Sequence, residues 1–288
     1  MPEGDAVWRT ARRLHEALSG RVITDSDLRW PSLATADLRG RTTVAVVPRG
    51  KHILHRLDDG LTLHSHLRME GSWRTHDPAR LTLRTLRAAD VRAVVGCATA
   101  TAVGLRLGML DLVRTVDESR LVGHLGPDLL GADWDPDQAV ANLLRQPERE
   151  IGAALLDQRN LAGVGTMWDA EVLFLQRVWP WAPVGELGPE ELRAVVVRVQ
   201  ALVDASKVRR WSVSTGSDRA GEELYVHGRS GLPCRRCGGP VRLSTIGRAP
   251  QDRAMFYCPT CQGGLGPQDD GRRQRPLGEG RAGPSRNG

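Results

Sequence analysis

Four of the five cysteines form two Cys-x-x-Cys pairs near the end of the chain. Cys234 and Cys237 make the first pair, and Cys258 and Cys261 make the second. Two such pairs can surround one Zn²⁺ with four thiolates while the segment between them forms a hairpin. The alternatives are a redox Cys-x-x-Cys or two unrelated pairs, but the βαβ setting of a thioredoxin-type motif is missing. The pattern therefore favours one structural Zn²⁺ site, closed to catalysis because all four ligands come from the protein.

The second residue is a proline whose nitrogen becomes a secondary amine if the initiator methionine is removed. An α-amine has a pKa of about 7.7–8.0, so a useful fraction is neutral at pH 7 and can attack an aldehydic carbon. The resulting iminium makes the adjacent C–H acidic and permits elimination, with Glu3 available to transfer protons. A Met-Pro-Glu start without catalytic meaning is the alternative for Pro2.

Lysine occurs only twice among the 40 basic residues, as Lys51 and Lys207. Lys51 lies in a turn between two strand-like runs, where it is either a solvated turn residue or a phosphate contact and proton donor. Further along, Gly163 and Gly165 precede a predicted helix, whose first amides could hold a phosphate. Ordinary packing between helices is the alternative for these two glycines.

Charge and composition restrict the class of protein. The 288 residues carry a formal net charge of +6, which indicates a polyanionic partner. Hydrophobic residues make up 40%, enough for a buried core, and Cys97 reads as a buried strand residue. No apolar run approaches the ~18 residues of a membrane span, and no secretory signal is recognisable. We expect a monomeric, cytoplasmic protein with no membrane partner.

The periodicity of apolar residues predicts how these candidates are positioned. Val7, Ala11 and Leu14 recur at helical spacing, which predicts a helix over 6–18 that Gly20 ends. Short β-branched runs between residues 21 and 115 predict an antiparallel sandwich or barrel. The later segments are predicted as a linker at 124–137, helices at 137–144, 151–156, 167–175 and 189–205, hairpins at 222–262, and a disordered tail at 263–288.

In combination and in order, these motifs resemble the formamidopyrimidine-DNA glycosylase and endonuclease VIII family of base-excision repair enzymes. The resemblance extends from residue 2 to residue 262. The opening Pro-Glu-Gly is more similar to the endonuclease VIII branch than to the branch that favours 8-oxoguanine. The segments that carry the resemblance are MPEGD, PRGKH, LHSHLRMEGSW, HLGPDLL, LLDQRNLAGVGTMWDAEVLFLQRVWP, VHGRSGLPCRRC and RAMFYCPTCQ.

The resemblance implies a mixed α and β fold in three parts and a tail. These are an N-terminal β-sandwich catalytic domain with one helix at 1–123, a helix–two-turn–helix DNA-binding domain at 124–221, a zinc-ribbon finger at 222–262, and the disordered tail at 263–288. One structural Zn²⁺ would be the only cofactor, and damaged double-stranded DNA, in the bacterial cytoplasm and nucleoid, would be the partner.

The resemblance also implies roles for individual residues. Pro2 would be the Schiff-base nucleophile on the sugar C1′, and Glu3 the general acid or base. Lys51 would contact phosphate and assist β-elimination. Arg253 matches the finger-tip arginine that grips the phosphates flanking the lesion and is assigned to δ-elimination.

Three more residues are implied to bind DNA. Met69 matches a side chain inserted into the gap left by the flipped-out base, and Arg68 lies beside it on the same loop. Thr166 stands where the helix–two-turn–helix motif usually has an asparagine that binds phosphate. A further departure lies at Asp5 and Ala6, where the family usually has Pro and Glu, so a carboxylate that orders the active site is missing or replaced by Asp5. The segment between the cysteine pairs is also longer than is common in the family.

The activity implied is that of a bifunctional DNA glycosylase and apurinic/apyrimidinic (AP) lyase that removes mainly oxidised pyrimidines and cuts the strand by β,δ-elimination. One alternative is a non-catalytic damaged-DNA-binding protein on the same scaffold, which Ala6 and Thr166 motivate. In a further alternative, the zinc ribbon mediates protein contact and leaves DNA binding to the other parts.

Overall fold

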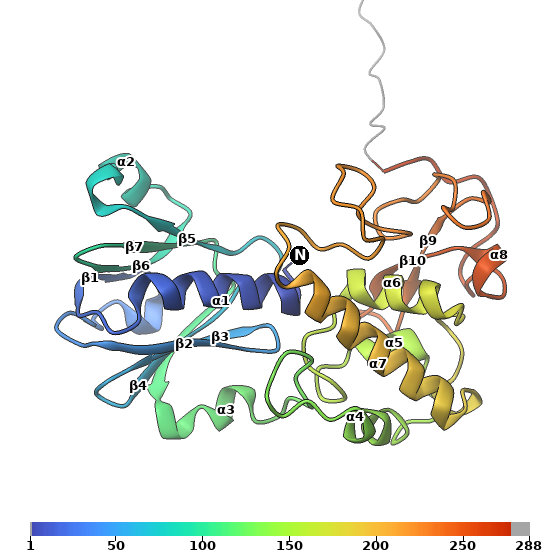
Figure 1. Ribbon diagram of the computed structural model, residues 1–288, viewed down its shortest axis with the longest axis horizontal. Coiled ribbons are helices and arrows are strands. Elements are labelled where there is room, and N and C mark those ends of the chain that lie inside the picture. Colours follow the sequence, from blue (N-terminus) through green and yellow to red (C-terminus); the bar gives the residue numbers. More distant parts are fainter. Residues whose placement is uncertain (1, 278–288) are drawn as a thin grey trace, which may run out of the picture. The chain divides into compact units, whose positions relative to one another are not determined.

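The structure, a computed structural model, describes residues 2–277 of the 288 (Figure 1). The chain folds into two compact units. The first unit contains the chain as far as Asp135, together with two short later segments, Leu161–Gly163 and Val203–Val208. The second unit contains Pro136–Asn160, Val164–Leu202 and the residues from Arg209 onward.

The first helix of the first unit, α1, runs over Gly4–Leu18 and lies between two sheets (Figure 1). Val7, Ala11 and Leu14 recur every three or four positions, so they share one face of the helix. This apolar face is buried. The helix ends before Gly20, whose φ of 72° is readily adopted only by glycine. The predicted helix is confirmed, with its start two residues earlier than expected.

Two antiparallel four-stranded sheets complete this unit, which confirms the predicted sandwich. The first sheet, in the order β2-β3-β4-β8, is formed by Thr43–Arg49, His52–Leu57, Leu61–His66 and Met109–Arg114. The second sheet, in the order β1-β6-β7-β5, is formed by Ile23–Leu28, Val91–Cys97, Thr101–Leu105 and Ser72–His76. Cys97 is buried on β6 as expected.

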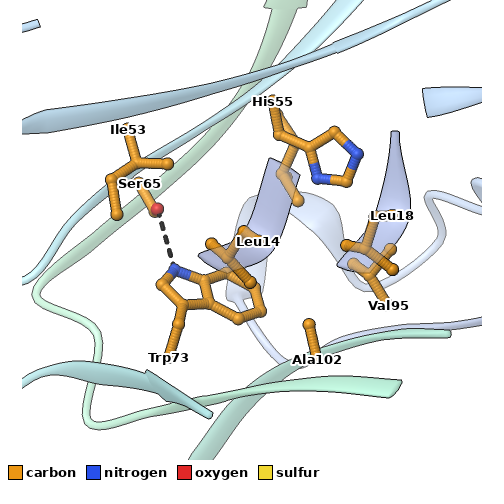
Figure 2. A pocket seen from close by; sticks show the side chains of 9 residues that line it. Leu14, Leu18, Ile53, His55, Ser65, Trp73, Val95 and Ala102 are labelled. Atoms are coloured by element: carbon orange, nitrogen blue, oxygen red, sulfur yellow. Dashed lines mark hydrogen bonds between the residues drawn. The ribbon is translucent and has the colours of Figure 1, made fainter. Parts of the chain in front are cut away.

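The core between the sheets contains two polar pairs beside a small cavity. Figure 2 shows the indole of Trp73 donating to Ser65 Oγ at 3.0 Å. His55 shares a 2.8 Å hydrogen bond with Thr43, and burial lowers its pKa to about 4. The cavity of about 10 Å³ between these side chains and α1 is at the lower limit for holding one water.

The outer face of the first sheet is covered by residues that follow β8. Leu54 on β3 packs with Val122, Leu125 and Ala162 in a small separate core. Part of the cover lies in the segment 124–137, which the sequence analysis treats as a linker. That prediction is wrong for 125–129 because Leu125 and Leu129 are buried and the backbone of residue 128 bridges to Ala162.

The second unit is helical, as predicted, before it reaches the cysteines. Each predicted helix is found within one or two residues, as α4 (Pro136–Leu143), α5 (Ile151–Leu156), α6 (Thr166–Gln176) and α7 (Pro189–Ser206). All residues of α6 from Trp168 to Phe174 are buried, so the helix has no solvent face there.

A hairpin of β9 (Arg242–Ile246) and β10 (Arg253–Tyr257) precedes the short helix α8 (Pro259–Gln262). The expectation of a disordered tail is wrong for residues 263–277. Asp269 forms a buried ion pair with Arg242, which holds the pKa of Asp269 at about 2, and Gln274 bonds to Ser230 at 2.7 Å. Residues 278–288 of the predicted tail lie outside the described residues.

The remaining helical elements are short. They are η1 (Pro31–Leu33), η2 (Pro78–Arg80), α2 (Leu83–Leu86), η3 (Thr115–Asp117), α3 (Ser119–Val122) and η4 (Val184–Glu186). Within residues 2–277, no helix has both the length and the apolar character needed to cross a membrane.

Candidate active site

The N-terminal residues are held against the segment 161–163, which lies far away in sequence. Gly4 N donates to Gly163 O at 3.0 Å, and a Cβ on Gly4 would lie only 3.2 Å from Gly163 Cα. The glycines therefore permit an approach that a side chain would hinder. Glu3, the residue before α1, is 2% exposed, and Pro2 before it is half-buried.

The turn that presents Lys51 is held by the same segment. Gly50 has a φ of 55°, and a Cβ added there would lie 3.0 Å from Ala162 Cβ and 3.6 Å from Gly163 N. Gly50 N donates to Asp128 Oδ2 at 2.7 Å. Residues 161–163 thus support both the N-terminus and the Lys51 turn, and so bring together two candidates that lie 49 positions apart in the sequence.

Asp128 is a functional candidate that the sequence analysis did not single out, although it lies in the HLGPDLL motif. Its carboxylate is buried and accepts from the amides of Gly50 and Leu130. Burial raises the pKa of this carboxyl, while the two amides oppose the shift. On the surface nearby, Arg49 forms a 2.6 Å ion pair with Asp133. Asp128 therefore fixes the backbone immediately before Lys51.

Arg68 and Met69 lie on the turn that follows β4. Arg68 has a φ of 54°, and its amide donates to His66 Nδ1 at 2.9 Å. Met69 is 67% exposed, which is unusual for an apolar side chain of this size. The turn therefore presents a guanidinium and a flexible apolar side chain to solvent, as an inserting side chain requires.

Asp5 does not take the place of the glutamate that the family usually has where this chain has Ala6. It is completely buried, and it contacts Arg9 at 3.0 Å and Ser206 Oγ at 3.1 Å. Arg9 also donates to Ser206 O at 2.8 Å. These contacts tie the first turn of α1 to residues 203–208, which is a structural role.

A histidine cluster lies on the outer face of the first sheet. His52 is directly opposite His66, and His64 is directly opposite Asp111. His52 Nδ1 lies 2.8 Å from His64 Nε2, and His64 Nδ1 lies 2.9 Å from Asp111 Oδ2. Burial is the main cause that lowers the pKa of His52 to about 3 and that of His66 to about 4. The strand register, which cannot be read from single residues, creates this cluster.

In the second unit, Thr166 is the first residue of α6, after Gly165 at the N-cap position. The loop before the helix is held by three side-chain amides that donate to backbone carbonyls. Asn142 bonds to Asn160 O at 3.0 Å, Asn160 bonds to Ala154 O at 2.9 Å, and Gln158 bonds to Val164 O at 2.9 Å. The helix N-terminus at Thr166 is therefore presented by a rigid loop.

Glu171 on α6 is a buried acidic residue that is surrounded by hydrogen-bond donors. Its buried carboxylate accepts from the amides of Tyr225, Val226 and His227, each at 2.8 Å, and from the hydroxyl of Ser214. Burial raises the pKa of Glu171, and these four donors oppose the shift. The loop that leads into the cysteines is thereby fixed to α6.

Arg253 begins β10 at the tip of the hairpin and is exposed. Its guanidinium donates to the carbonyls of Gln251 and Asp252 at 3.0 and 2.9 Å. These bonds orient the side chain without neutralising its charge, so the guanidinium keeps its attraction for anions.

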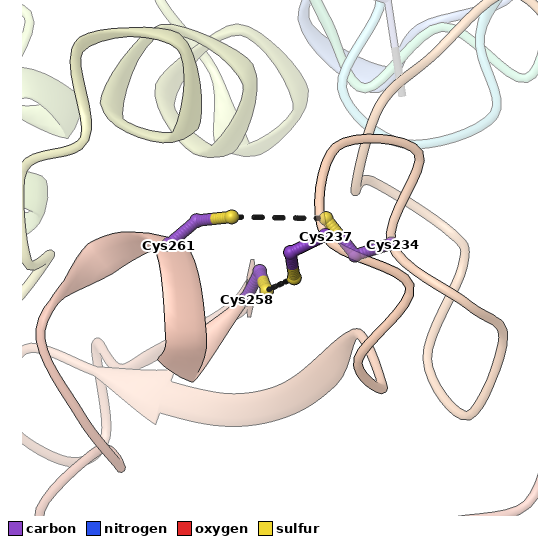
Figure 3. Close-up of side chains that lie close together, drawn as sticks. All are labelled: Cys234, Cys237, Cys258 and Cys261. Atoms are coloured by element: carbon purple, nitrogen blue, oxygen red, sulfur yellow. Dashed lines mark hydrogen bonds between the residues drawn. The ribbon is translucent and has the colours of Figure 1, made fainter.

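The four cysteines of the two pairs come together beside α8 (Figure 3). All four sulfurs lie within 4.8 Å of one another, with Cys234 and Cys261 at 4.0 Å and Cys237 and Cys258 at 3.5 Å. Four sulfurs at 2.3 Å from a tetrahedral Zn²⁺ would be ~3.8 Å apart, whereas a disulfide would bring two of them to ~2.05 Å. The donor set and its spacing therefore fit a zinc ion. Among residues 2–277, no other group of three or more His, Cys, Asp or Glu side chains meets this criterion.

The predicted site residues are divided between the two units. Pro2, Glu3, Lys51, Arg68 and Met69 belong to the first unit, in which residues 161–163 contact Gly4 and Gly50, the neighbours of Glu3 and Lys51. The second unit contains Thr166, Arg253 and the four cysteines.

Comparison with known proteins gives consistent matches over most of the chain. The family model of the formamidopyrimidine-DNA glycosylase N-terminal domain matches residues 1–97, and that of its H2TH domain matches residues 125–215. A "Probable endonuclease 8 2" of Streptomyces coelicolor is 50% identical over 94% of this chain and 98% of its own length. The "DNA-(apurinic or apyrimidinic site) lyase Nei2" of Mycolicibacterium smegmatis is 40% identical over 91% of this chain and 99% of its own length.

Among solved structures, the Lactococcus lactis formamidopyrimidine-DNA glycosylase bound non-covalently to DNA with an AP site has a TM-score of 0.75. That match has 23% identity and covers 91% of this chain and 99% of the other, so it supports the fold. The two family models match the N-terminal part and the H2TH part of the chain in the order in which they occur in the sequence. The chain therefore belongs to the formamidopyrimidine-DNA glycosylase and endonuclease VIII family.

Proposed function

We propose that the protein is a bifunctional DNA glycosylase and AP lyase of base-excision repair that acts on damaged double-stranded DNA. The observation that carries the proposal is the common support of Pro2–Glu3 and the Lys51 turn by residues 161–163. An amine nucleophile and a cationic side chain are thus fixed in one unit, as attack at a sugar carbon and the following elimination require.

In the proposed reaction, the amine of Pro2 attacks C1′ of the damaged nucleotide. The bond from C1′ to the base breaks, and the base leaves with the proton of the amine. The C1′–O4′ bond then breaks, O4′ takes up a proton, and a ring-opened iminium remains. Loss of a C2′ proton then breaks the bond to the 3′ oxygen, and a second elimination breaks the bond to the 5′ oxygen. Glu3 transfers protons in these steps, and Lys51 contacts phosphate and assists the first elimination.

The remaining candidates bind DNA in the proposal. Arg68 and Thr166 contact the backbone, and Met69 fills the gap left by the flipped-out nucleotide. Arg253 grips the phosphates flanking the lesion and serves the second elimination. The exposure of Met69 and the exposed guanidinium of Arg253 support these roles.

The four cysteines hold one Zn²⁺, whose only contribution is to fix the finger, because four thiolates leave no open position. We propose domain boundaries at 1–123, 124–221 and 222–262. We also propose that oxidised pyrimidines are the main lesions, and that the protein acts as a monomer in the cytoplasm and at the nucleoid.

Borohydride trapping on a duplex with one AP site tests the mechanism. Reduction of the iminium should give a covalent protein–DNA adduct that maps to the Pro2 peptide. Pro2→Thr should lose the adduct and strand cleavage, while His76→Gln, on the outer strand of the other sheet, should retain both. An adduct on the Lys51 peptide would move the nucleophile to that residue.

Binding without any adduct, from protein with a verified Pro2 N-terminus and bound zinc, would favour a non-catalytic damaged-DNA-binding protein. Ala6 and the buried, ion-paired Asp5 are the observations behind that second candidate, because the usual carboxylate is missing at this turn. Excision assays on duplexes carrying oxidised pyrimidines or 8-oxoguanine test the lesion preference.

A further inference from the structure

The residues that follow α8 lie along the hairpin of β9 and β10. We refer to residues 266–276 as the C-terminal strap. They come after the last of the four cysteines, so they are no part of that donor set. β9 and β10 form a sheet of only two strands, and such a hairpin is marginally stable by itself. Support from another segment therefore matters for how firmly the hairpin is held.

Gln274 of the strap occupies the edge of β9 that β10 leaves open. Its Oε1 accepts from Leu243 N at 2.7 Å, and its Nε2 donates to Leu243 O at 2.8 Å. A residue of a third antiparallel strand would make the same pair of bonds. Oε1 also accepts from the hydroxyl of the buried Ser230 at 2.7 Å. The backbone of the strap passes so close to Gly231 that a Cβ there would lie 2.7 Å from Gln274 O.

Asp269 of the strap connects the two strands at the base of the hairpin. Arg242 and Tyr257 are directly opposite each other in the ladder, and both donate to its carboxylate. The side chains of Arg242 and Asp269 are 5% and 1% exposed, so solvent screens this ion pair little. Arg242 also donates to Arg272 O at 2.9 Å. The phenol oxygen of Tyr257 accepts from Gly266 N at 2.9 Å. The strap therefore holds both strands at once.

The ladder connects this base to the tip of the hairpin. Arg253, the first residue of β10, is paired with Ile246, the last residue of β9. Two further bonds hold β9 and its turn, from the Trp181 indole to Thr245 O and from Gly247 N to Glu150, each at 2.9 Å. Because these bonds reach β9 and its turn, the position of Arg253 depends on how firmly β10 is paired with β9.

We propose that the C-terminal strap is a positioning element for the second elimination, in which Gln274 and Asp269 fix the hairpin that presents Arg253. The proposal rests on the proposed function, because that step is the one assigned to Arg253. In the step, a proton leaves C4′, a C4′–C5′ double bond forms, and the phosphate leaves C5′ with the bonding electrons. Arg253 offsets the charge of the departing phosphate, and a fixed guanidinium does so better than a mobile one.

Hydrogen exchange on the DNA-free protein tests whether the strap holds the hairpin. Gln274→Ala removes both bonds to Leu243 and leaves the cysteines and Arg253 in place. We expect exchange of the peptides that contain β9 and β10 to accelerate about fivefold, as expected for one hydrogen bond of ordinary strength. Asp269→Asn, which removes the charge opposite Arg242, should accelerate it as well. Asp270→Asn is the matched control, because it makes the same change in a side chain that is 63% exposed, and should exchange like the native protein.

Product analysis on a duplex with one AP site tests the consequence for the chemistry. Denaturing gels separate the 3′ aldehyde left by the first elimination from the 3′ phosphate left by both. We expect Gln274→Ala and Asp269→Asn to lower the ratio of phosphate to aldehyde about fivefold, in the direction of Arg253→Ala. Borohydride trapping at Pro2, which belongs to the other unit, should stay within about twofold of the native rate. Asp270→Asn should keep both native values.

Native exchange or a native product ratio in either strap variant would overturn the proposal. An equal fall in trapping and in the ratio would also overturn it, because a general loss of DNA binding acts on both steps. Loss of zinc from Gln274→Ala would do the same, since the strap would then serve the folding of the finger.

The proposed function fails in a different way. Native protein that gives no adduct at Pro2 contradicts the lyase mechanism, and a native ratio in Arg253→Ala contradicts the role of that arginine. Native protein that is trapped and yields both products, with strap variants that match it, contradicts only the strap.

Discussion

Replacement of Glu171 by glutamine tests how the loop leading into the cysteines is held. In the native structure, Oε1 accepts from the amides of Val226 and His227, and Oε2 accepts from the amide of Tyr225 and the hydroxyl of Ser214. Glutamine has one oxygen. With that oxygen facing Val226 and His227, its –NH₂ group faces the Tyr225 amide, and the Ser214 hydroxyl can turn to accept.

One buried amide donor is then unsatisfied, at a cost of about 1–3 kcal/mol, and the other bonds lose their charge assistance. This loss is partly offset because the neutral amide avoids the desolvation that raises the pKa of Glu171. We therefore expect Glu171→Gln to weaken the anchoring of the loop by about 1–3 kcal/mol.

Hydrogen exchange of the peptide that contains residues 225–227 measures this anchoring directly. Exchange should accelerate by about 5- to 150-fold if it proceeds through local opening. Ser214→Ala is the control, because it removes one donor and leaves the carboxylate with its three amides, so its effect should be smaller. Unchanged exchange in Glu171→Gln, or a larger effect of Ser214→Ala, would refute the reasoning.

Three other changes have defined outcomes. Asp128→Ala should slow cleavage at AP sites. It should also lower the unfolding free energy by roughly 1–3 kcal/mol, because the Gly50 amide alone loses its acceptor. Asp133→Ala, in an exposed ion pair, is the control and should lower the unfolding free energy by less than about 1 kcal/mol. Because burial lowers the pKa of His55 to about 4, its stabilising contribution is complete above pH 6.5 and lost as pH falls to about 4. This loss is about 3 kcal/mol, so urea titrations between pH 7 and pH 4.5 should show a shallower pH dependence for His55→Leu. Cys258→Ser, or chelation of the native protein, should lower the zinc content and weaken DNA binding, and unchanged binding by the metal-free protein would show that DNA recognition does not need the finger.

The arrangement of the first unit explains why the N-terminal segment and the Lys51 turn do not depend on flexible loops. Both are held by backbone contacts at glycines, where substitution would require the facing backbone or side chain to move. Gly4→Ala and Gly50→Ala would therefore affect the site without removing any chemical group.

The sequence by itself determined the helices and the four cysteines that could hold a metal ion. The apolar spacing of Val7, Ala11 and Leu14 defines α1, because a helix with that stripe can bury it in only one orientation. The spacing of the cysteine pairs defines their ligand set, because each Cys-x-x-Cys brings two thiolates together locally. Motif order was also sufficient to identify the family, because each segment keeps its place along the chain.

Only the tertiary structure decided which distant residues became partners. The pairing of His52 with His64, and of His64 with Asp111, depends on the register of three strands, which a shift of one residue would change. Asp128 and Glu171 read as ordinary acidic residues in the sequence, but burial leaves them no water, so their carboxylates must accept from backbone amides brought by other segments. Residues 263–277, which were expected to be disordered, are likewise held by a tertiary contact. Asp269 can pair with Arg242 only after the hairpin has formed.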